Sequence, residues 1–126
     1  MIDRLDHLVL TVASIDASIA FYVEVLGMAE ISFGDGRKAL SFGRQKINLH
    51  EVGRDMKLVA LRPTAGSGDL CLIAAGPLAD MQAHVESRGV AIEVGPVVRS
   101  GATGPIRSIY FRDPDGNLVE VSTYDV

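Results

Sequence analysis

The strongest constraint on the fold of this chain is an internal repeat. The spacing from His7 to Gly27 equals the spacing from Asp69 to Gly89, 20 residues in each case. Aligned at this offset without a gap, the two segments share identical residues at several positions, among them Leu8 and Leu70, Leu10 and Leu72, Ala17 and Ala79, Val23 and Val85, Glu24 and Glu86. The chain is therefore predicted to contain two copies of one structural unit.

Each copy has the pattern of a strand, a helix and three further strands. In the first copy, an apolar strand over 5–12 precedes Ser14, a helix-capping residue, and apolar residues at helical spacing that end at Gly27. The remaining strands are predicted over the following ranges: 28–33, 38–42 and 46–52. In the second copy, the helix is predicted over 78–88 and the strands over these ranges: 69–74, 92–98, 106–111 and 117–123.

These elements predict an α+β chain of two tandem β-α-β-β-β modules within one domain, 1–126. Module one covers about 1–61, a loop-like segment over 62–68 links the modules, and module two covers about 69–126. The glycine-rich stretch 100–105 is predicted to be the longest loop of module two, and a mobile one.

Composition removes several classes of partner. A formal charge of −4 gives no electrostatic reason to expect nucleic acid or an anionic membrane. No apolar stretch approaches the roughly 20 residues of a membrane-spanning helix, and the first residues lack a secretory pattern. Cys71 is the only cysteine, so no internal disulfide can form and a cytoplasmic location is expected. Its apolar strand pattern places Cys71 in the core rather than in a nucleophilic role.

A strand-turn-strand segment near the C-terminus contains one unexpected carboxylate. Apolar residues over 109–111 and 118–121 flank the sequence Asp-Pro-Asp-Gly-Asn, which is typical of a tight turn. Strand side chains alternate between faces, so Glu120 shares a face with Leu118. A carboxylate in such a strand needs either solvent or a partner such as a metal ion.

Aligning the two copies places four polar side chains at two equivalent positions. His7 and Asp69 lie in the first strand of each copy, and His50 and Glu120 lie in the last. A pseudo-two-fold relation would bring these strands together, and two imidazoles with a carboxylate suit a divalent transition metal. We therefore predict His7, His50 and Glu120 as metal ligands, with Asp69 as a fourth ligand or an acid–base group. The alternatives are that the histidines pack in the core and that Asp69 is a turn residue.

These motifs resemble the vicinal oxygen chelate superfamily, which includes glyoxalase I, extradiol dioxygenases, fosfomycin-resistance transferases and bleomycin-binding proteins. The resemblance rests on the 109–120 segment, on Asp6-His7 and on Leu49-His50. Segments 5–12, 37–40, 48–53 and 104–106 are most similar to the group of glyoxalase domain-containing protein five and its bacterial relatives. The resemblance covers nearly the whole chain, and it implies that the two modules form a cup-shaped curved mixed sheet.

The resemblance also implies a function. The cup would hold one divalent metal ion (Zn, Ni, Mn, Fe or Co) that binds two neighbouring oxygens of a small-molecule substrate, in a homodimer whose sites are shared between chains. A glyoxalase-like lyase or isomerase is favoured. A ring-cleaving dioxygenase is an alternative, although no histidine lies over 101–103, where its signature begins. A non-catalytic, resistance-type binding protein is another, although such proteins lack the metal-binding set.

Further site residues follow from strand alternation and from the same resemblance. Positions that share a face with the ligands predict Val9, Cys71, Ser108 and Tyr110 as lining the substrate pocket. Glu120, Asp69 and Tyr110 are the predicted catalytic groups, with Tyr110 as a hydrogen-bond or proton donor. The alternative for Tyr110 is a half-buried strand aromatic whose hydroxyl lies at the surface.

Overall fold

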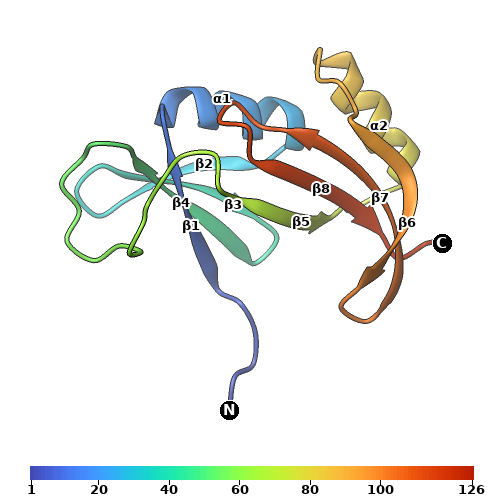
Figure 1. Ribbon diagram of the computed structural model, residues 1–126, viewed down its shortest axis with the longest axis horizontal. Helices are drawn as coiled ribbons and strands as arrows, with labels where there is room; N and C mark the ends of the chain where they lie inside the picture. The colour runs from blue at the N-terminus through green and yellow to red at the C-terminus, as the bar shows by residue number, and fades with distance from the viewer. The chain divides into compact units, whose positions relative to one another are not determined.

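A computed structural model describes all residues, 1–126, and divides them into two compact units, Met1–Ser67 and Gly68–Val126. Each unit contains one helix and one four-stranded sheet (Figure 1). The first unit comprises β1 (His7–Val12), α1 (Ile15–Leu26), β2 (Ala29–Phe33), β3 (Arg37–Phe42) and β4 (Gln45–Glu51). The second unit comprises β5 (Asp69–Ile73), α2 (Leu78–Ser87), β6 (Val94–Gly101), β7 (Gly104–Arg112) and β8 (Leu118–Thr123).

The two sheets have the same topology. Their strand orders are β1-β4-β3-β2 and β5-β8-β7-β6. In each, the first strand pairs in parallel with the last, and the other neighbours are antiparallel. The predicted α+β class and the two β-α-β-β-β modules are thereby confirmed.

Helix α1 is anchored at both ends and to the end of β4. Ser14 accepts a hydrogen bond from the backbone N–H of Ala17, and Gly27 ends the helix in a left-handed conformation with φ of 70°. Glu51 accepts a hydrogen bond of 3.0 Å from the backbone N–H of Ile15. This bond lowers the pKa of Glu51, as does the nearby Arg54. The last residues of β4, including His50, are thus held in place by the helix start.

The core of each unit lies between its helix and one face of its sheet. In the first unit this face carries apolar side chains, and the buried ones are Leu10, Val12, Leu40, Ile47 and Leu49. In the second unit the buried residues on the corresponding face are Ile109, Phe111, Val119 and Val121, with Val85 from the helix. Because strand side chains alternate, the polar residues of interest lie on the opposite face of each sheet.

Two sequence-based predictions are wrong. Residues 100–105 do not form a long loop, because β6 and β7 pair as far as Gly101 and Gly104 and leave only a two-residue turn. A side chain at Gly101 would lie 2.8 Å from the Tyr124 hydroxyl, so the absence of one permits this close approach. Cys71 is exposed rather than part of the core, because it lies on the face of β5 opposite the helix.

The predicted turn between β7 and β8 is confirmed and is tied to the start of β5. Asp113 accepts hydrogen bonds of 2.9 Å from the backbone N–H groups of Asp115 and Asn117. The Asn117 side chain donates to Asp113 at 2.8 Å and accepts from the backbone N–H of Gly68 at 2.6 Å. These bonds fix the β5–β8 register, in which Cys71 lies opposite Glu120.

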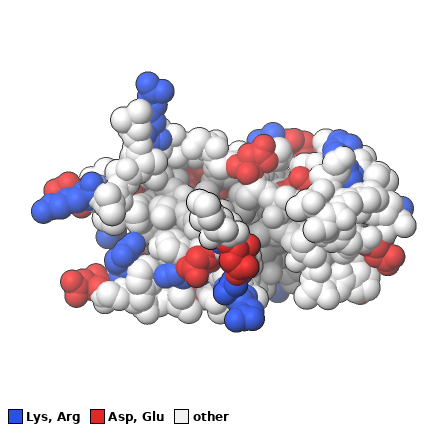
Figure 2. All heavy atoms as spheres, turned by 90° about the horizontal axis from the view of Figure 1, so that it is seen from below, with Lys and Arg blue, Asp and Glu red and all other residues white.

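Charged side chains are dispersed over the surface. On the face drawn in Figure 2, Lys and Arg side chains alternate with Asp and Glu side chains rather than gathering by sign. Neither helix is long and apolar enough to cross a membrane.

Candidate functional site

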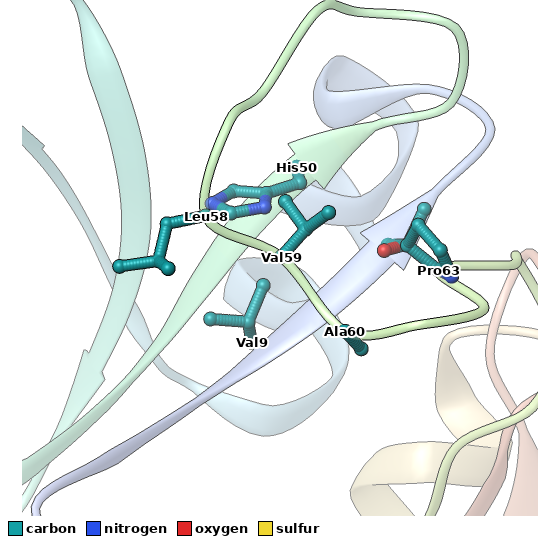
Figure 3. A pocket seen from close by; sticks show the side chains of 7 residues that line it. Val9, His50, Leu58, Val59, Ala60 and Pro63 are labelled. Atoms are coloured by element: carbon teal, nitrogen blue, oxygen red, sulfur yellow. The ribbon is translucent and has the colours of Figure 1, made fainter.

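The first unit contains a cavity of about 340 Å³ at the end of β1 and β4. Parallel pairing places His50 opposite Thr11 and Asn48 opposite Val9. The segment over 58–63 passes above these strands and completes the lining, which consists of Val9, Thr11, His50, Leu58, Val59, Ala60 and Pro63. Figure 3 shows the His50 imidazole directed toward the segment that carries Leu58 and Val59. Val9 is one of the residues that line this cavity.

His50 has the properties of a ligand donor. Its Nε2 atom is buried and has no hydrogen-bond partner. Leaving a buried polar atom unbonded costs about 1–3 kcal/mol, and an ion that binds this nitrogen would remove that cost. Burial lowers the pKa of His50, and the positive charge of Arg37 lowers it further. Both effects favour the neutral imidazole, which is the form that binds metal ions.

Asn48 is a second unbonded polar group on the same face. Its side chain is buried, with 4% exposed, and its Oδ1 atom has no hydrogen-bond partner. It lies two positions before His50 on β4, so both side chains point away from the helix. Sequence reasoning missed Asn48. The available signal was an amide two positions before a candidate ligand in an otherwise apolar strand.

His7 lies on this face but apart from His50. It is opposite Lys46 at the start of β1, four positions from Thr11, the partner of His50. At about 3.3 Å per residue, four positions correspond to roughly 13 Å. The His7 ring contacts the Asp6 carboxylate at 2.8 Å. Neither unit gathers three His, Cys, Asp or Glu side chains into a group that could hold a metal ion.

The second unit centres on Glu120. This residue lies opposite Cys71 on β5 and opposite Tyr110 on β7. The Ser108 hydroxyl donates to Glu120 Oε2 at 2.6 Å, and the Ser122 hydroxyl donates to the same oxygen at 3.3 Å. The two hydroxyls are 2.7 Å apart, and Cys71 Sγ lies 3.3 Å from Ser122 Oγ. This network orients the carboxylate. Ser122 was not predicted, although it lies two positions after Glu120 and shares its face.

Three further predicted residues lie on the same face of the second sheet. Partial desolvation raises the pKa of the Cys71 thiol, although the residue is exposed, and this argues against a nucleophilic thiolate. Burial also raises the pKa of Tyr110, and Glu120 beside it acts in the same direction. Tyr110 therefore keeps its proton and can donate it in a hydrogen bond. Asp69 lies opposite Leu118, two positions before Cys71 on β5, and is exposed.

Residues 4–121 match the model of the Glyoxalase/Bleomycin resistance protein/Dioxygenase superfamily. Virulence protein STM3117 of Salmonella typhimurium is 54% identical over 124 residues, covering 98% of this chain and 86% of that protein. Glyoxalase domain-containing protein RDO1 of Mycosarcoma maydis is 52% identical over 120 residues, which cover 95% of this chain and 68% of that protein. The structure of integron cassette protein VCH_CASS1 of V. cholerae superposes with a TM-score of 0.98 at 57% identity, and the match covers 99% of this chain and 98% of that one.

More distant structures share the fold alone. The lactoylglutathione lyase of Agrobacterium tumefaciens has a TM-score of 0.75 at 24% identity, covering 98% of this chain and 96% of that one. TnmS3, an antibiotic binding protein of Streptomyces, has a TM-score of 0.77 at 21% identity, covering 97% and 96%. The chain thus belongs to the glyoxalase, bleomycin resistance and dioxygenase superfamily, whose vicinal oxygen chelate fold its two repeated modules adopt.

Proposed function

We propose that this chain is a divalent-metal-dependent enzyme of the glyoxalase-like class, a lyase or isomerase acting on a small substrate held through adjacent oxygens. The observation that carries the proposal is the buried, unbonded Nε2 atom of His50 beside a cavity. Membership of the superfamily supports the proposal, because many of its members bind a divalent metal ion. The oriented Glu120 carboxylate supports it as well.

His50, Glu120 and His7 are the proposed ligands, and Asp69 is a fourth ligand or an acid–base group. The two histidines are about four strand positions apart in one chain. We propose a homodimer with shared sites, in which each ligand set draws on two copies of the chain. A bound ion would supply Lewis acidity to the two substrate oxygens. Tyr110, which keeps its proton, would donate a hydrogen bond to the substrate.

Metal content tests the proposal. Untagged protein would be incubated with Mn, Fe, Co, Ni or Zn, desalted and analysed by elemental mass spectrometry. We expect about one ion per chain in the wild type, loss of the ion in His50→Ala, and retention in His84→Ala, whose exposed histidine on α2 makes it the matched control. A wild type without bound metal, or a His50→Ala variant with unchanged content, would contradict the proposal. Turnover of hemithioacetals rather than catechols would separate a lyase or isomerase from a dioxygenase.

A non-catalytic binding protein is the second candidate. Five of the seven residues that line the cavity are apolar: Val9, Leu58, Val59, Ala60 and Pro63. Such a lining suits retention of an organic molecule without reaction, and TnmS3, an antibiotic binding protein, shares the fold. Tight binding of a compound that is recovered unchanged, by protein without metal, would favour this candidate.

A further inference from the structure

A positively charged cluster lies on the same face of the first sheet as His50. The Arg37 guanidinium carbon is 4.7 Å from the centroid of the Phe33 ring, and the Lys46 ammonium nitrogen is 3.8 Å from it. The two cations are therefore at most about 8.5 Å apart, the sum of these distances. We call Phe33, Arg37 and Lys46 the cationic cluster.

Strand pairing places Arg37 next to His50. The β3–β4 ladder pairs Lys38 with Leu49, so Arg37 comes opposite His50 at the next position. Alternation along β3 puts Arg37 and Ala39 on the face that carries Asn48 and His50. The cluster and the cavity thus share one sheet face within a single unit.

Arg37 has no acidic partner, in contrast to two other cations of the sheets. On the opposite face, its neighbour Lys38 contacts the Glu30 carboxylate at 2.9 Å. In the second unit, Arg112 contacts Glu93 at 3.0 Å. Arg37 makes no such ion pair and instead stacks near the Phe33 ring. A guanidinium held against an aromatic ring keeps its N–H donors available and pre-oriented for bidentate binding of a carboxylate.

An unbonded hydrogen-bond acceptor lies on the same face and would bind a second group of the ligand. Asn48 Oδ1 is buried without a hydrogen-bond partner and accepts only from an N–H or O–H group. Asn48 is two positions from His50, a distance of about 7 Å along the strand. A molecule of four or five carbons can span this distance with a carboxylate at one end and a hydroxyl group at the other.

We propose that this face binds a small carboxylic acid that also carries a hydroxyl group, with Arg37 taking the carboxylate and Asn48 accepting from the hydroxyl beside His50. The proposal rests on the proposed function, since it names the substrate class of the same site. It assigns Arg37 and Asn48 as determinants of specificity.

The test is titration calorimetry on the metal-replete protein with malate and 2-hydroxyglutarate. Succinate, which lacks the hydroxyl of malate, and dimethyl malate, which lacks its charges, are the matched comparators. We expect at least one hydroxy acid to bind, and Arg37→Gln to weaken it by about ten- to hundredfold. Arg44→Gln, an exposed arginine in the β3–β4 turn, should leave binding unchanged. Asn48→Ala should weaken malate but not succinate.

The outcomes distinguish failure of the proposed hydroxy-acid ligand from failure of the proposed metal-dependent function. Arg37 is exposed and makes no hydrogen bond, so Arg37→Gln should fold and keep its metal. If the wild type holds a metal that His50→Ala loses, yet no hydroxy acid binds more tightly to the wild type than to Arg37→Gln, the metal site stands and the substrate class is wrong. Binding of dimethyl malate as tightly as malate would overturn the role of Arg37 in the same way.

Discussion

Truncation of two buried asparagines should change the stability of the protein by very different amounts. Asn117 is 1% exposed, and both ends of its carboxamide are hydrogen-bonded, to the backbone N–H of Gly68 and to the Asp113 carboxylate. Asn48 is 4% exposed, and its Oδ1 atom has no partner. The comparison of Asn117→Ala with Asn48→Ala therefore separates an amide that stabilises the fold from one whose oxygen is unbonded.

The magnitudes follow from the bonds that each variant removes. Asn117→Ala loses one neutral hydrogen bond, about 1 kcal/mol, and one to a carboxylate, about 1.5–3 kcal/mol, so the free energy of unfolding should fall by about 3 kcal/mol. For a chain of this length that corresponds to a decrease in Tm of roughly 10 °C. In Asn48→Ala the lost packing is offset by removal of a buried unbonded oxygen, so the free energy should change by less than about 1 kcal/mol.

Differential scanning calorimetry and urea unfolding of the two variants and the wild type would measure both effects. The reasoning is refuted if Asn48→Ala costs as much as Asn117→Ala, because the Asn48 carboxamide would then be hydrogen-bonded within the folded protein. It is refuted equally if Asn117→Ala leaves Tm unchanged, because the turn would then not hold β5 against β8.

Three other predictions concern the site and its support. Ser108→Ala removes the 2.6 Å donor to Glu120, so metal affinity in a chelator competition should fall about 10- to 100-fold with an unchanged circular dichroism spectrum; full affinity would contradict this. Burial, and to a lesser extent the charge of Arg37, lowers the pKa of His50 in the folded protein, so the folded state favours the neutral imidazole. The free energy of unfolding should therefore be unaffected by His50 above about pH 6.5 and should fall as the pH drops below it. Between pH 7 and pH 5 this fall should be steeper in the wild type than in His50→Ala. Gly95→Ala would place Cβ 2.4 Å from the Ser108 carbonyl oxygen at a φ of 114°, and should lower Tm by more than 10 °C; a normal Tm would show that β6 can shift.

The repeat and its elements were predictable because their signals are local. Helical spacing before Gly27, the capping Ser14 and the turn residues between β7 and β8 each act over a few positions. Alternation along a strand also predicted correctly that Ser108 and Tyr110 share a face with Glu120. These inferences require no knowledge of which strands pair.

The features that sequence reasoning missed depend on long-range pairing. The glycines over 100–105 indicate a loop, whereas in the structure they form a tight hairpin in which the Tyr124 hydroxyl lies close to Gly101. The exposure of Cys71 depends on which face of β5 the helix covers. The placement of Arg37 beside His50 depends on the β3–β4 register, which a strand's own residues do not specify.

The separation of His7 from His50 has the same origin. Both were predicted as ligands from their equivalent places in the repeat, yet the parallel register of β1 and β4 sets them four positions apart along the ladder. The repeat in the sequence does not determine the register between β1 and β4, and therefore does not determine how far apart the two histidines lie. The shared ligand set therefore remains a prediction.

X-ray absorption at the zinc edge of zinc-loaded protein tests the central claim most directly, since it reports which atoms surround the ion. The account predicts nitrogen and oxygen neighbours at about 2.0–2.2 Å, with imidazole scattering that weakens in His50→Ala. A sulfur neighbour at about 2.3 Å would show that Cys71, which lies opposite Glu120, binds the ion instead. That result, or an unchanged spectrum in His50→Ala, would contradict the account.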